Sequence, residues 1–483
     1  MYRYNFGKGV VTLKKYEKIA LALQEWIQEQ MIRQDRRNWD EKGIRLPAVR
    51  TVAKQYQCSI STVIRAYEWL EHRHLVYAIP QSGYYAVQNG TGAQDMDWQE
   101  PLDFASAAPD PRVFPYADFR HCMDLAMRQK QDELFLYGTQ QGLPSLIALL
   151  QKQFADYQVF AGAEQFFITS GVQQALAALA LMTFPGGKTK VMVELPTYHN
   201  MPTLLESLRV PIAGVRRTLV EGLDWDSLER QFAEGDIKFF YVMPRFQNPI
   251  GTSMTAVEKK RLLRLAQRYD VYLVEDDYLA DLEDSARQDP LWSYDTHERV
   301  IYLKSYSKIL FPGLRIGVTV LPSALVSGFG LYKRMLDIDT SVLSQAALEV
   351  YIHSGMFAHH RKTIRSRYAS RMQVVHEQLA THPDFAPFRD APRTGGEHTV
   401  LPLPLGMPVS TLISRLENRG ILADTTERYY PSGMVERGRE PGIETMLRLN
   451  ISNVPKQRIE EGMQKIREEI SRLQLKSQRE GME

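Results

Sequence analysis

Apolar residues near the N-terminus recur at helical spacing in three segments. In residues 14–34 they lie three or four positions apart, which predicts an amphipathic helix. Pro47 suits the first turn of a helix, so we expect a second helix over about 47–56. After a turn at 57–59, a third helix is expected at 61–72, with Val63, Tyr67 and Leu70 on its buried side. Two apolar runs flank a turn and predict a two-stranded hairpin: 75–79 and 84–87, around 80–83.

Beyond residue 160, short apolar runs alternate with stretches of helical period. The runs predict strands at 165–169, 190–195, 238–243, 271–275, 300–303 and 317–321. Helices are expected at 173–183 and 258–269, and this alternation predicts an α/β body with a largely parallel sheet covered by helices. Near the C-terminus, a strand at 399–405 and helices at 409–418 and 456–473 predict a smaller α+β subdomain.

Length and charge divide the chain further. A chain of 483 residues exceeds what one hydrophobic core organises, so two or three domains are expected. Residues 89–95 are small and polar without periodicity, which predicts a linker at 88–102 between domains at 12–87 and 103–475. Residues 1–90 carry 14 Lys and Arg against 8 Asp and Glu, a net +6; the rest carries 45 against 49, a net −4. The basic N-terminal unit alone suits a polyanion.

Composition also narrows the class of protein. Two cysteines, Cys58 and Cys122, exclude a disulfide framework and are typical of a reducing compartment. No apolar run approaches the roughly 18 residues of a membrane helix, so no membrane partner and a cytoplasmic location are expected. The 11 histidines are scattered, and no metal-ligand spacing is found in the sequence. We therefore expect no metal site.

The N-terminal unit has the pattern of a helix-turn-helix. Ser59, Ser61, Thr62 and Arg65 lie near the start or on the open face of the third helix, the part that such folds point into the major groove of DNA. Residues 12–87 resemble the GntR class of winged helices, with Leu-Pro-x-x-Arg at 46–50, Thr-Val at 62–63 and Ser-Gly-Tyr at 82–84. The resemblance implies that double-stranded DNA is contacted by Arg50, Ser61, Thr62, Arg65 and Gly83.

Two positions depart from that class. The family often has arginine where this chain has Ile60 and Gln81. Fewer charges weaken phosphate contacts and lower the salt dependence of binding, whereas an apolar Ile60 can meet a thymine methyl group.

Polar residues follow four of the predicted strands in the body. They occur in the segments 170–174, 244–251, 275–278 and 305–317. In open α/β sheets, chemistry gathers at the carboxyl ends of the strands. The segment 170–174 joins a strand to a helix, so its backbone N–H groups and the helix dipole can hold a phosphate.

These segments resemble the fold-type I pyridoxal-phosphate enzymes of the aminotransferase class I family, over about residues 103–475. Together with the GntR-like unit, the chain resembles the MocR-type transcriptional regulators. The resemblance implies that Lys308 forms the Schiff base with pyridoxal 5'-phosphate and that Asp276 keeps the pyridine nitrogen protonated. Tyr278 and Asn248 would bond the ring hydroxyl, and Tyr198 would stack on the ring. The phosphate would be held by Gly171, Val172, Gln173, Ser305 and Arg315.

Three more residues complete the expected site. Tyr137, before Gly142, resembles the tyrosine that reaches the phosphate of a neighbouring subunit, which implies a homodimer. Arg448 matches the arginine that grips a substrate carboxylate, so an amino acid or related amino compound is the expected effector or substrate. Arg245 lies close to the expected cofactor in sequence, and we consider it as a second anion contact.

The sequence leaves three functions open. The first is a dimeric DNA-binding regulator that senses pyridoxal phosphate or an amino compound. The second is a working aminotransferase with a vestigial or autoregulatory N-terminal unit, and the third is a regulator with an inactive pocket. The presence of these residues does not establish turnover, because transamination also needs proton-transfer geometry and product release.

Overall fold

The structure is a computed structural model that divides the chain into two compact units, Met1–Gln99 and Glu100–Glu483. It describes residues 14–33, 39–40, 43–72, 75–79, 82–86, 101–107, 109–134, 136–283, 288–381, 395–404, 406–432 and 445–480. Most of the expected linker, 88–100, and the wing residue Gln81 lie outside these ranges. Among the described helices, none has both the length and the apolar character that crossing a bilayer requires. The described His, Cys, Asp and Glu side chains form no group of three placed to hold a metal ion.

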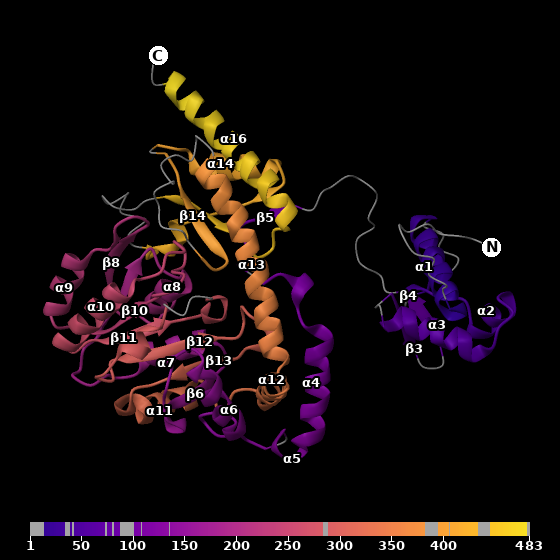
Figure 1. Cartoon of the computed structure of the whole chain (residues 1–483), viewed down its shortest axis with the longest axis horizontal. Helices are drawn as coiled ribbons and strands as arrows, with labels where there is room; N and C mark the ends of the chain where they lie inside the picture. Colours follow the sequence, from indigo (N-terminus) through magenta and orange to yellow (C-terminus); the bar gives the residue numbers. More distant parts are fainter. Residues whose placement is uncertain are drawn as a thin grey trace. The chain divides into compact units, whose positions relative to one another are not determined.

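The first unit contains the expected three helices and hairpin (Figure 1). The helices are α1 (Lys15–Arg33), α2 (Val49–Gln55) and α3 (Ile60–His72), and the hairpin pairs β3 (Val76–Ile79) with β4 (Gly83–Ala86). A two-residue pair, β1 (Trp39–Asp40) with β2 (Gly43–Ile44), was not expected. The apolar sides of the three helices pack into one core. The Tyr67 ring stacks there on the Tyr84 ring, with 4.3 Å between the ring centroids. The hairpin is thereby packed against α3.

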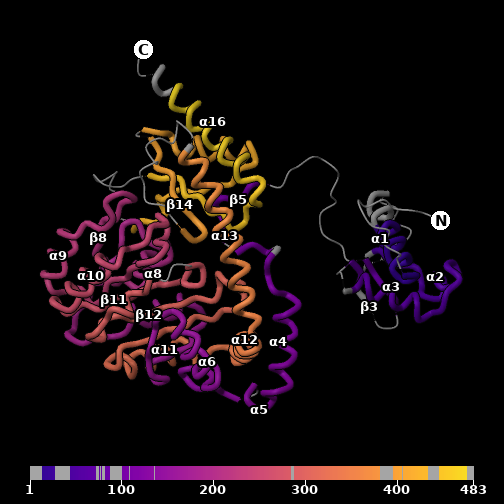
Figure 2. The backbone as a smooth tube through the Cα atoms, viewed as in Figure 1, coloured from indigo at the N-terminus to yellow at the C-terminus, as the bar shows by residue number. Residues whose placement is uncertain are grey.

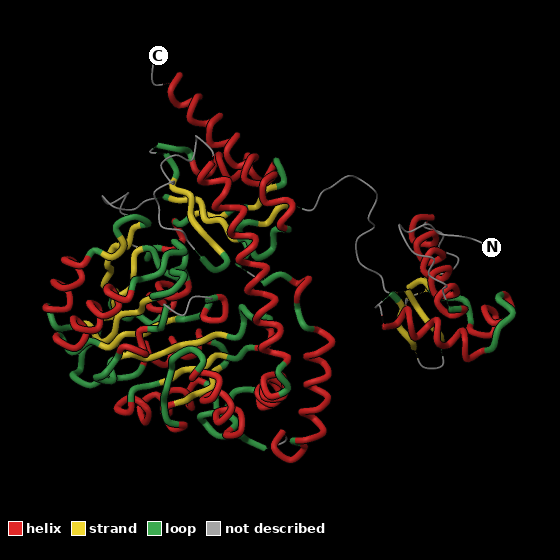
Figure 3. Tube along the Cα trace, viewed as in Figure 1, coloured by secondary structure: helices red, strands yellow, loops and turns green. Residues whose placement is uncertain are grey.

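An eight-stranded sheet forms the centre of the second unit (Figure 3). The strands predicted from the sequence are β6 (Phe166–Thr169), β7 (Lys190–Leu195), β10 (Ile237–Val242), β11 (Tyr272–Asp276), β12 (Val300–Ser305) and β13 (Gly317–Val320). Two further strands at one edge, β8 (Ile212–Thr218) and β9 (Gly222–Leu223), were not predicted. The order is β6-β13-β12-β11-β10-β7-β8-β9, and β13 runs antiparallel to both of its neighbours.

Alternate residues of the central strands pack into different cores. Val191, Phe239 and Val274 belong to the core under α7 (Val172–Leu181), whereas Met192 and Phe240 belong to the core under α9 (Trp225–Ala233) and α10 (Ala256–Arg268). This two-residue alternation is why a strand buried on both faces reads as a continuous apolar run. The remaining helices of this part are α4 (Tyr116–Gln129), α5 (Gln131–Leu134), α6 (Pro144–Ala155), α8 (Asn200–Ser207), α11 (Val326–Leu336) and α12 (Val342–His353).

The C-terminal part forms the smaller α+β subdomain that the sequence predicts. Its three-stranded antiparallel sheet contains β14 (His398–Pro402), β17 (Met446–Asn450) and β16 (Asp424–Thr425). Its helices are α14 (Val409–Asn418), α16 (Lys456–Glu480) and the long α13 (Met356–Thr381), which runs on towards α12 (Figure 2). A second small sheet pairs β15 (Ile421–Leu422) with β5 (Leu102–Asp103). Leu102, predicted to end the linker, is therefore part of the body.

Candidate functional site

A cavity of about 240 Å³ opens at the carboxyl ends of β11 and β12. Because these ends meet at one edge of the sheet, residues far apart in sequence become neighbours there. Ten residues predicted for the site line this cavity: Gly171, Val172, Gln173, Tyr198, Asn248, Asp276, Tyr278, Ser305, Lys308 and Arg315. The sequence motifs therefore locate one site, and six further lining residues were not predicted from the sequence: Ala107, His199, Met243, Ser307, Arg428 and Tyr429.

The turn from β6 to α7 brings the N-terminus of a helix to the cavity, with Gly171, Val172 and Gln173 in its lining. Gly171 has φ of 81°, which only glycine adopts without strain, and a Cβ there would lie 2.8 Å from Arg315 Nη2. Arg315 Nη2 donates to the Ser170 carbonyl at 3.0 Å, so the guanidinium stands at the start of α7. A Cβ on Gly317 would meet the Gly171 and Val172 backbone at 2.7 Å, which fixes β13 close against this turn. An arginine at a helix N-terminus is suited to a phosphate.

Asp276 ends β11 with its carboxylate pointing away from water. Its Oδ2 accepts a hydrogen bond from the Tyr241 hydroxyl at 2.6 Å, while Oδ1 is buried and has no partner among the described residues. Burial raises the pKa of this carboxyl to about 7. A buried carboxyl with one unpartnered oxygen has an acceptor left for a ligand.

Three polar groups surround the same space. Tyr198 accepts a hydrogen bond from Asn200 Nδ2 at 2.8 Å, and Tyr278 donates to the Phe246 carbonyl at 3.3 Å. Asn248 Oδ1 is buried and unpartnered within the described ranges. Burial raises the pKa of both tyrosine hydroxyls, so they are protonated donors at neutral pH. The donors, the acceptor and the aromatic ring suit a small planar ligand.

Lys308 projects from the turn between β12 and β13. Its Nζ lies 3.0 Å from Glu397 Oε1 and also donates to the Ala107 carbonyl. The carboxylate of Glu397 is buried, with 1% of the side chain exposed, whereas 22% of the Lys308 side chain is exposed to the cavity. Glu397 was not predicted from the sequence, because its partner is 89 residues away along the chain.

Arg448 lies in β17 and is fully buried. It is not among the residues that line the cavity. Its Nη1 donates to the Ala105 carbonyl at 3.4 Å, and its guanidinium carbon is 5.7 Å from the centre of the Tyr429 ring. Nε and Nη2 have no hydrogen-bond partner among the described residues. Tyr429 lines the cavity, so Arg448 lies next to a lining residue. Its Nε and Nη2 groups remain available as hydrogen-bond donors.

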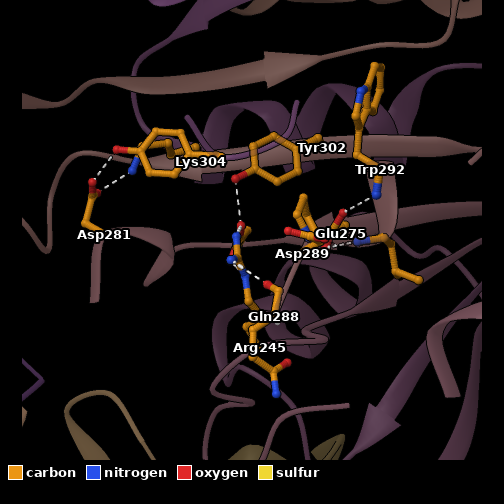
Figure 4. Close-up of polar contacts among 12 residues, drawn as sticks. Arg245, Glu275, Asp281, Gln288, Asp289, Trp292, Tyr302 and Lys304 are labelled. Carbon is orange, nitrogen blue, oxygen red and sulfur yellow. Dashed lines mark hydrogen bonds and ion pairs between the residues drawn. The ribbon is translucent and has the colours of Figure 1, made fainter. Parts of the chain in front are cut away.

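The hypothesis that Arg245 contacts an anion is wrong in this structure. Its guanidinium donates to both carboxylate oxygens of Asp277, with 2.9 Å between Nε and Oδ1. It also donates to the Gln288 carbonyl at 2.9 Å (Figure 4). The Tyr302 hydroxyl donates to the same carboxylate at 2.6 Å. A buried guanidinium satisfied by a carboxylate is structural, and neither side chain lines the cavity.

Tyr137 does not line this cavity either. Its side chain is 81% exposed and borders a separate hollow of about 470 Å³ together with Lys130, Pro144 and Gln345. Its expected role toward a second copy of the chain stays a prediction.

One of the unpredicted lining residues, His199, has a pKa well below its ordinary value. Burial lowers its pKa to about 4, so the imidazole is neutral at neutral pH. It stands edge-on between Tyr198 and Tyr429, with centroid distances of 5.2 and 5.4 Å. The sequence Pro196–Thr197–Tyr198 located this segment, and its next residue could have been included on that ground.

In the first unit, the predicted contact residues lie at the surface. Ser59 Oγ bonds the hydroxyls of Ser61 and Thr62 at 2.9 and 2.8 Å and accepts from the Thr62 N–H, so these side chains gather at the start of α3. Arg65 is exposed one turn later on α3, and Arg50 is exposed at the start of α2. Gly83 is exposed in the hairpin with φ of 118°.

Two exposed groups near these residues extend the face. Ile60 and Ile64 of α3, which are four residues apart on the helix, are 50% and 38% exposed. Arg45, which the sequence reasoning did not single out, donates from Nη2 to the Ser82 carbonyl at 2.6 Å and places a cation beside the hairpin.

Comparison with known proteins settles the family of the body. The sequence profile of the family described as aminotransferase class I and II matches residues 107–466. The chain belongs to this family. A kynurenine aminotransferase of Pyrococcus horikoshii, solved in complex with PMP, superposes with a TM-score of 0.68 and 28% identity over 78% of this chain and 92% of that chain.

Two proteins named as regulators are also similar to this chain. YcxD of Bacillus subtilis (strain 168), named an uncharacterized HTH-type transcriptional regulator, is 47% identical over 454 residues, which are 93% of this chain and 98% of that protein. A probable rhizopine catabolism regulatory protein of Rhizobium meliloti, MocR, is 30% identical over 68% of this chain and 71% of its own length. The predicted resemblance to MocR-type regulators is confirmed.

Proposed function

We propose that this member of the aminotransferase class I and II family is a DNA-binding transcriptional regulator whose body binds pyridoxal phosphate and senses the cofactor or an amino compound. The observation that carries the proposal is the cavity in which Asp276, Asn248 and Lys308 meet, because two of them present buried unpartnered oxygens. Buried polar atoms without partners are rare in proteins and mark a place for a ligand.

The residues fit this cofactor. The backbone at 171–173 and the Arg315 guanidinium would hold its phosphate, Asp276 would pair with its ring nitrogen, and Asn248 and Tyr278 would reach its ring hydroxyl. Tyr198 would lie against the ring, and Lys308 would bond its aldehyde. When bound, the cofactor supplies an electrophilic carbon and an electron-withdrawing ring.

The N-terminal unit would act as a winged helix-turn-helix. Exposed Ser61 and Arg65 and half-buried Thr62, near the start of α3, would face the major groove, with Arg50 on a phosphate and the hairpin at Gly83 as the wing. The protein would work as a homodimer in the cytoplasm, in which Tyr137 reaches the cofactor phosphate of the second copy. Its 81% exposure supports a role outside its own chain's cavity.

A DNase footprint upstream of the protein's own gene and its neighbours tests the regulator. The footprint is recorded at stated salt, with and without pyridoxal phosphate. We expect protection of repeated half-sites that changes with the cofactor, since a ligand shifts a two-state equilibrium through its differential affinity. Absence of specific protection in either state would contradict the regulator.

A working aminotransferase is the second candidate function. The complete set of lining residues favours it, as does the 27% identity to a protein of Thermococcus litoralis named aromatic-amino-acid aminotransferase 1. Formation of keto acids is measured across a range of amino donors. Sustained multiple turnovers at enzyme-like rates would refute a pure sensor.

The cofactor assignment has its own test. Lys308→Ala removes the amine that bonds the aldehyde, so the visible absorbance band of lysine-bound cofactor should vanish. An unchanged spectrum in this variant would refute the assignment.

A further inference from the structure

We propose that Glu397 and the Ala107 carbonyl form a holding site for the Lys308 ammonium. The Lys308 ammonium would bind at this holding site when an amino compound replaces Lys308 on the cofactor. The proposal rests on the proposed function, because it takes Lys308 to be the residue that bonds the cofactor. Glu397 is then a positioning residue, which acts through Lys308.

The backbone that carries Glu397 is anchored by a contact that does not involve Lys308. The Ile451 N–H donates to the Glu397 carbonyl at 2.8 Å, which anchors Glu397 to the segment after β17. Its carboxylate thus approaches from the smaller subdomain, while Lys308 comes from the turn after β12. The two charged atoms lie 3.0 Å apart, within hydrogen-bond distance.

Because the Glu397 carboxylate is buried, it is stabilised by the Lys308 ammonium as its counter-ion. Only 1% of the Glu397 side chain is exposed, and its Oε2 is buried with no partner in the described part of the chain. Lys308 provides the one side-chain hydrogen bond to this carboxylate that the described residues contain. A buried charge that loses its counter-ion is strongly disfavoured, so the Glu397 carboxylate favours every state in which Lys308 is a free ammonium.

Exchange at the cofactor produces such a state. The bond from the cofactor carbon to the Lys308 nitrogen breaks as the bond to the ligand nitrogen forms. The ligand nitrogen carries three protons as a free ammonium and one after it bonds to the cofactor. The Lys308 nitrogen carries one proton while it is bonded to the cofactor and three after its release. Protons and charge therefore balance without an added base or oxidant, and Glu397 and Ala107 accept hydrogen bonds from the ammonium that is released.

The holding site favours binding over turnover. An ammonium has no lone pair, so a held Lys308 cannot remove a proton from the bound ligand. Arg448, of opposite charge to Glu397 and on the neighbouring strand β17, forms no ion pair within the described ranges and keeps two donors for a ligand carboxylate. The pocket can thus exchange its lysine for an amino compound and hold the result, which is what a sensor requires.

Titration with methoxyamine tests the holding site. This neutral amine has no carboxylate, so Arg448 does not contribute; its nitrogen gives up two protons and Lys308 again leaves as an ammonium. Full-length protein loaded with pyridoxal phosphate is titrated, and loss of the lysine-bound absorbance band is followed. We expect Glu397→Gln to need about tenfold more methoxyamine for half conversion, because it lacks a charged acceptor. Glu397→Asp, with a shorter reach, should need several-fold more, which keeps the test available if the glutamine variant does not fold.

Asp281→Asn is the matched control. Asp281 is a buried carboxylate that pairs with a buried lysine of β12, Lys304, but neither lines the cavity (Figure 4). It should titrate as the unmodified protein does. Equal half-conversion concentrations in the unmodified protein and the available Glu397 variants would overturn the holding site alone. An unmodified protein whose spectrum matches that of Lys308→Ala would overturn the proposed function instead.

Discussion

Replacing Asp276 by asparagine should stabilise the cofactor-free protein at pH 8. The same replacement should remove the ion pair between this side chain and the ring nitrogen of the cofactor. Burial raises the pKa of Asp276 to about 7 from its ordinary value of 3.8. Because the folded-state pKa is raised, the folded protein binds a proton that the unfolded chain has released. The stabilising contribution of this proton is full below pH 3.8 and is lost as the pH rises through 7.

The structure gives the magnitude. A pKa difference of about three, at about 1.4 kcal/mol for each, corresponds to about 4 kcal/mol of stability lost between acid and alkaline pH. Asparagine carries no charge, and its carbonyl can still accept the hydrogen bond of the Tyr241 hydroxyl. Its amide would occupy the place of Oδ1, which has no partner among the described residues, at a cost of about 1 to 3 kcal/mol. The net gain of Asp276→Asn at pH 8 is therefore about 1 to 3 kcal/mol.

Denaturant unfolding of the full-length protein, stripped of cofactor and checked by its visible absorbance, measures this gain at pH 5 and pH 8. Glu275, whose pKa burial also raises to about 7, titrates in the same window, so only the difference between the two proteins reports Asp276. The advantage of the variant should grow from pH 5 to pH 8. A variant less stable than the unmodified protein at pH 8, or a difference independent of pH, would refute the reasoning. With cofactor present the order should reverse, since only the carboxylate can pair with a protonated ring nitrogen.

Three further substitutions test other parts of the molecule. Gly171→Ala places a Cβ 2.8 Å from Arg315 Nη2 at a φ of 81°, so the Arg315 guanidinium must shift away from the start of α7 and pyridoxal phosphate should bind about tenfold more weakly in an absorbance titration; unchanged affinity would contradict this site for the phosphate. Arg50→Ala should weaken operator binding and lower the salt slope of log Kd by about 1, measured by fluorescence anisotropy at several salt concentrations, and an unchanged slope would remove Arg50 from the phosphate contacts. Asp277→Asn leaves the buried Arg245 without its counter-ion and should cost about 3 to 5 kcal/mol in denaturant unfolding; a loss below 1 kcal/mol would show that the ion pair is dispensable.

Local sequence determined the elements and much of the site. The helices α1, α3 and α14 and the strands β7 and β11 follow from apolar spacing alone, because each buries one stripe or both faces against the rest of the chain. The strand β8 was missed, since its sequence alternates small, apolar and charged residues near the edge of the sheet and lacks the continuous apolar run of a central strand. Its place is fixed by pairing with β7.

The site divides in the same way. Gly171, Asp276 and Lys308 were identified from the sequence because each belongs to a short segment that follows a predicted strand and resembles the aminotransferase class I family. The contact of Lys308 with Glu397 and the pairing of Arg245 with Asp277 were not, since their partners lie 89 and 32 residues away. Charge and spacing along the chain show which groups are present. Only the packing of strands and subdomains decides which opposite charges are buried together, because burial in a medium of low polarity is what makes one pairing much more favourable than another.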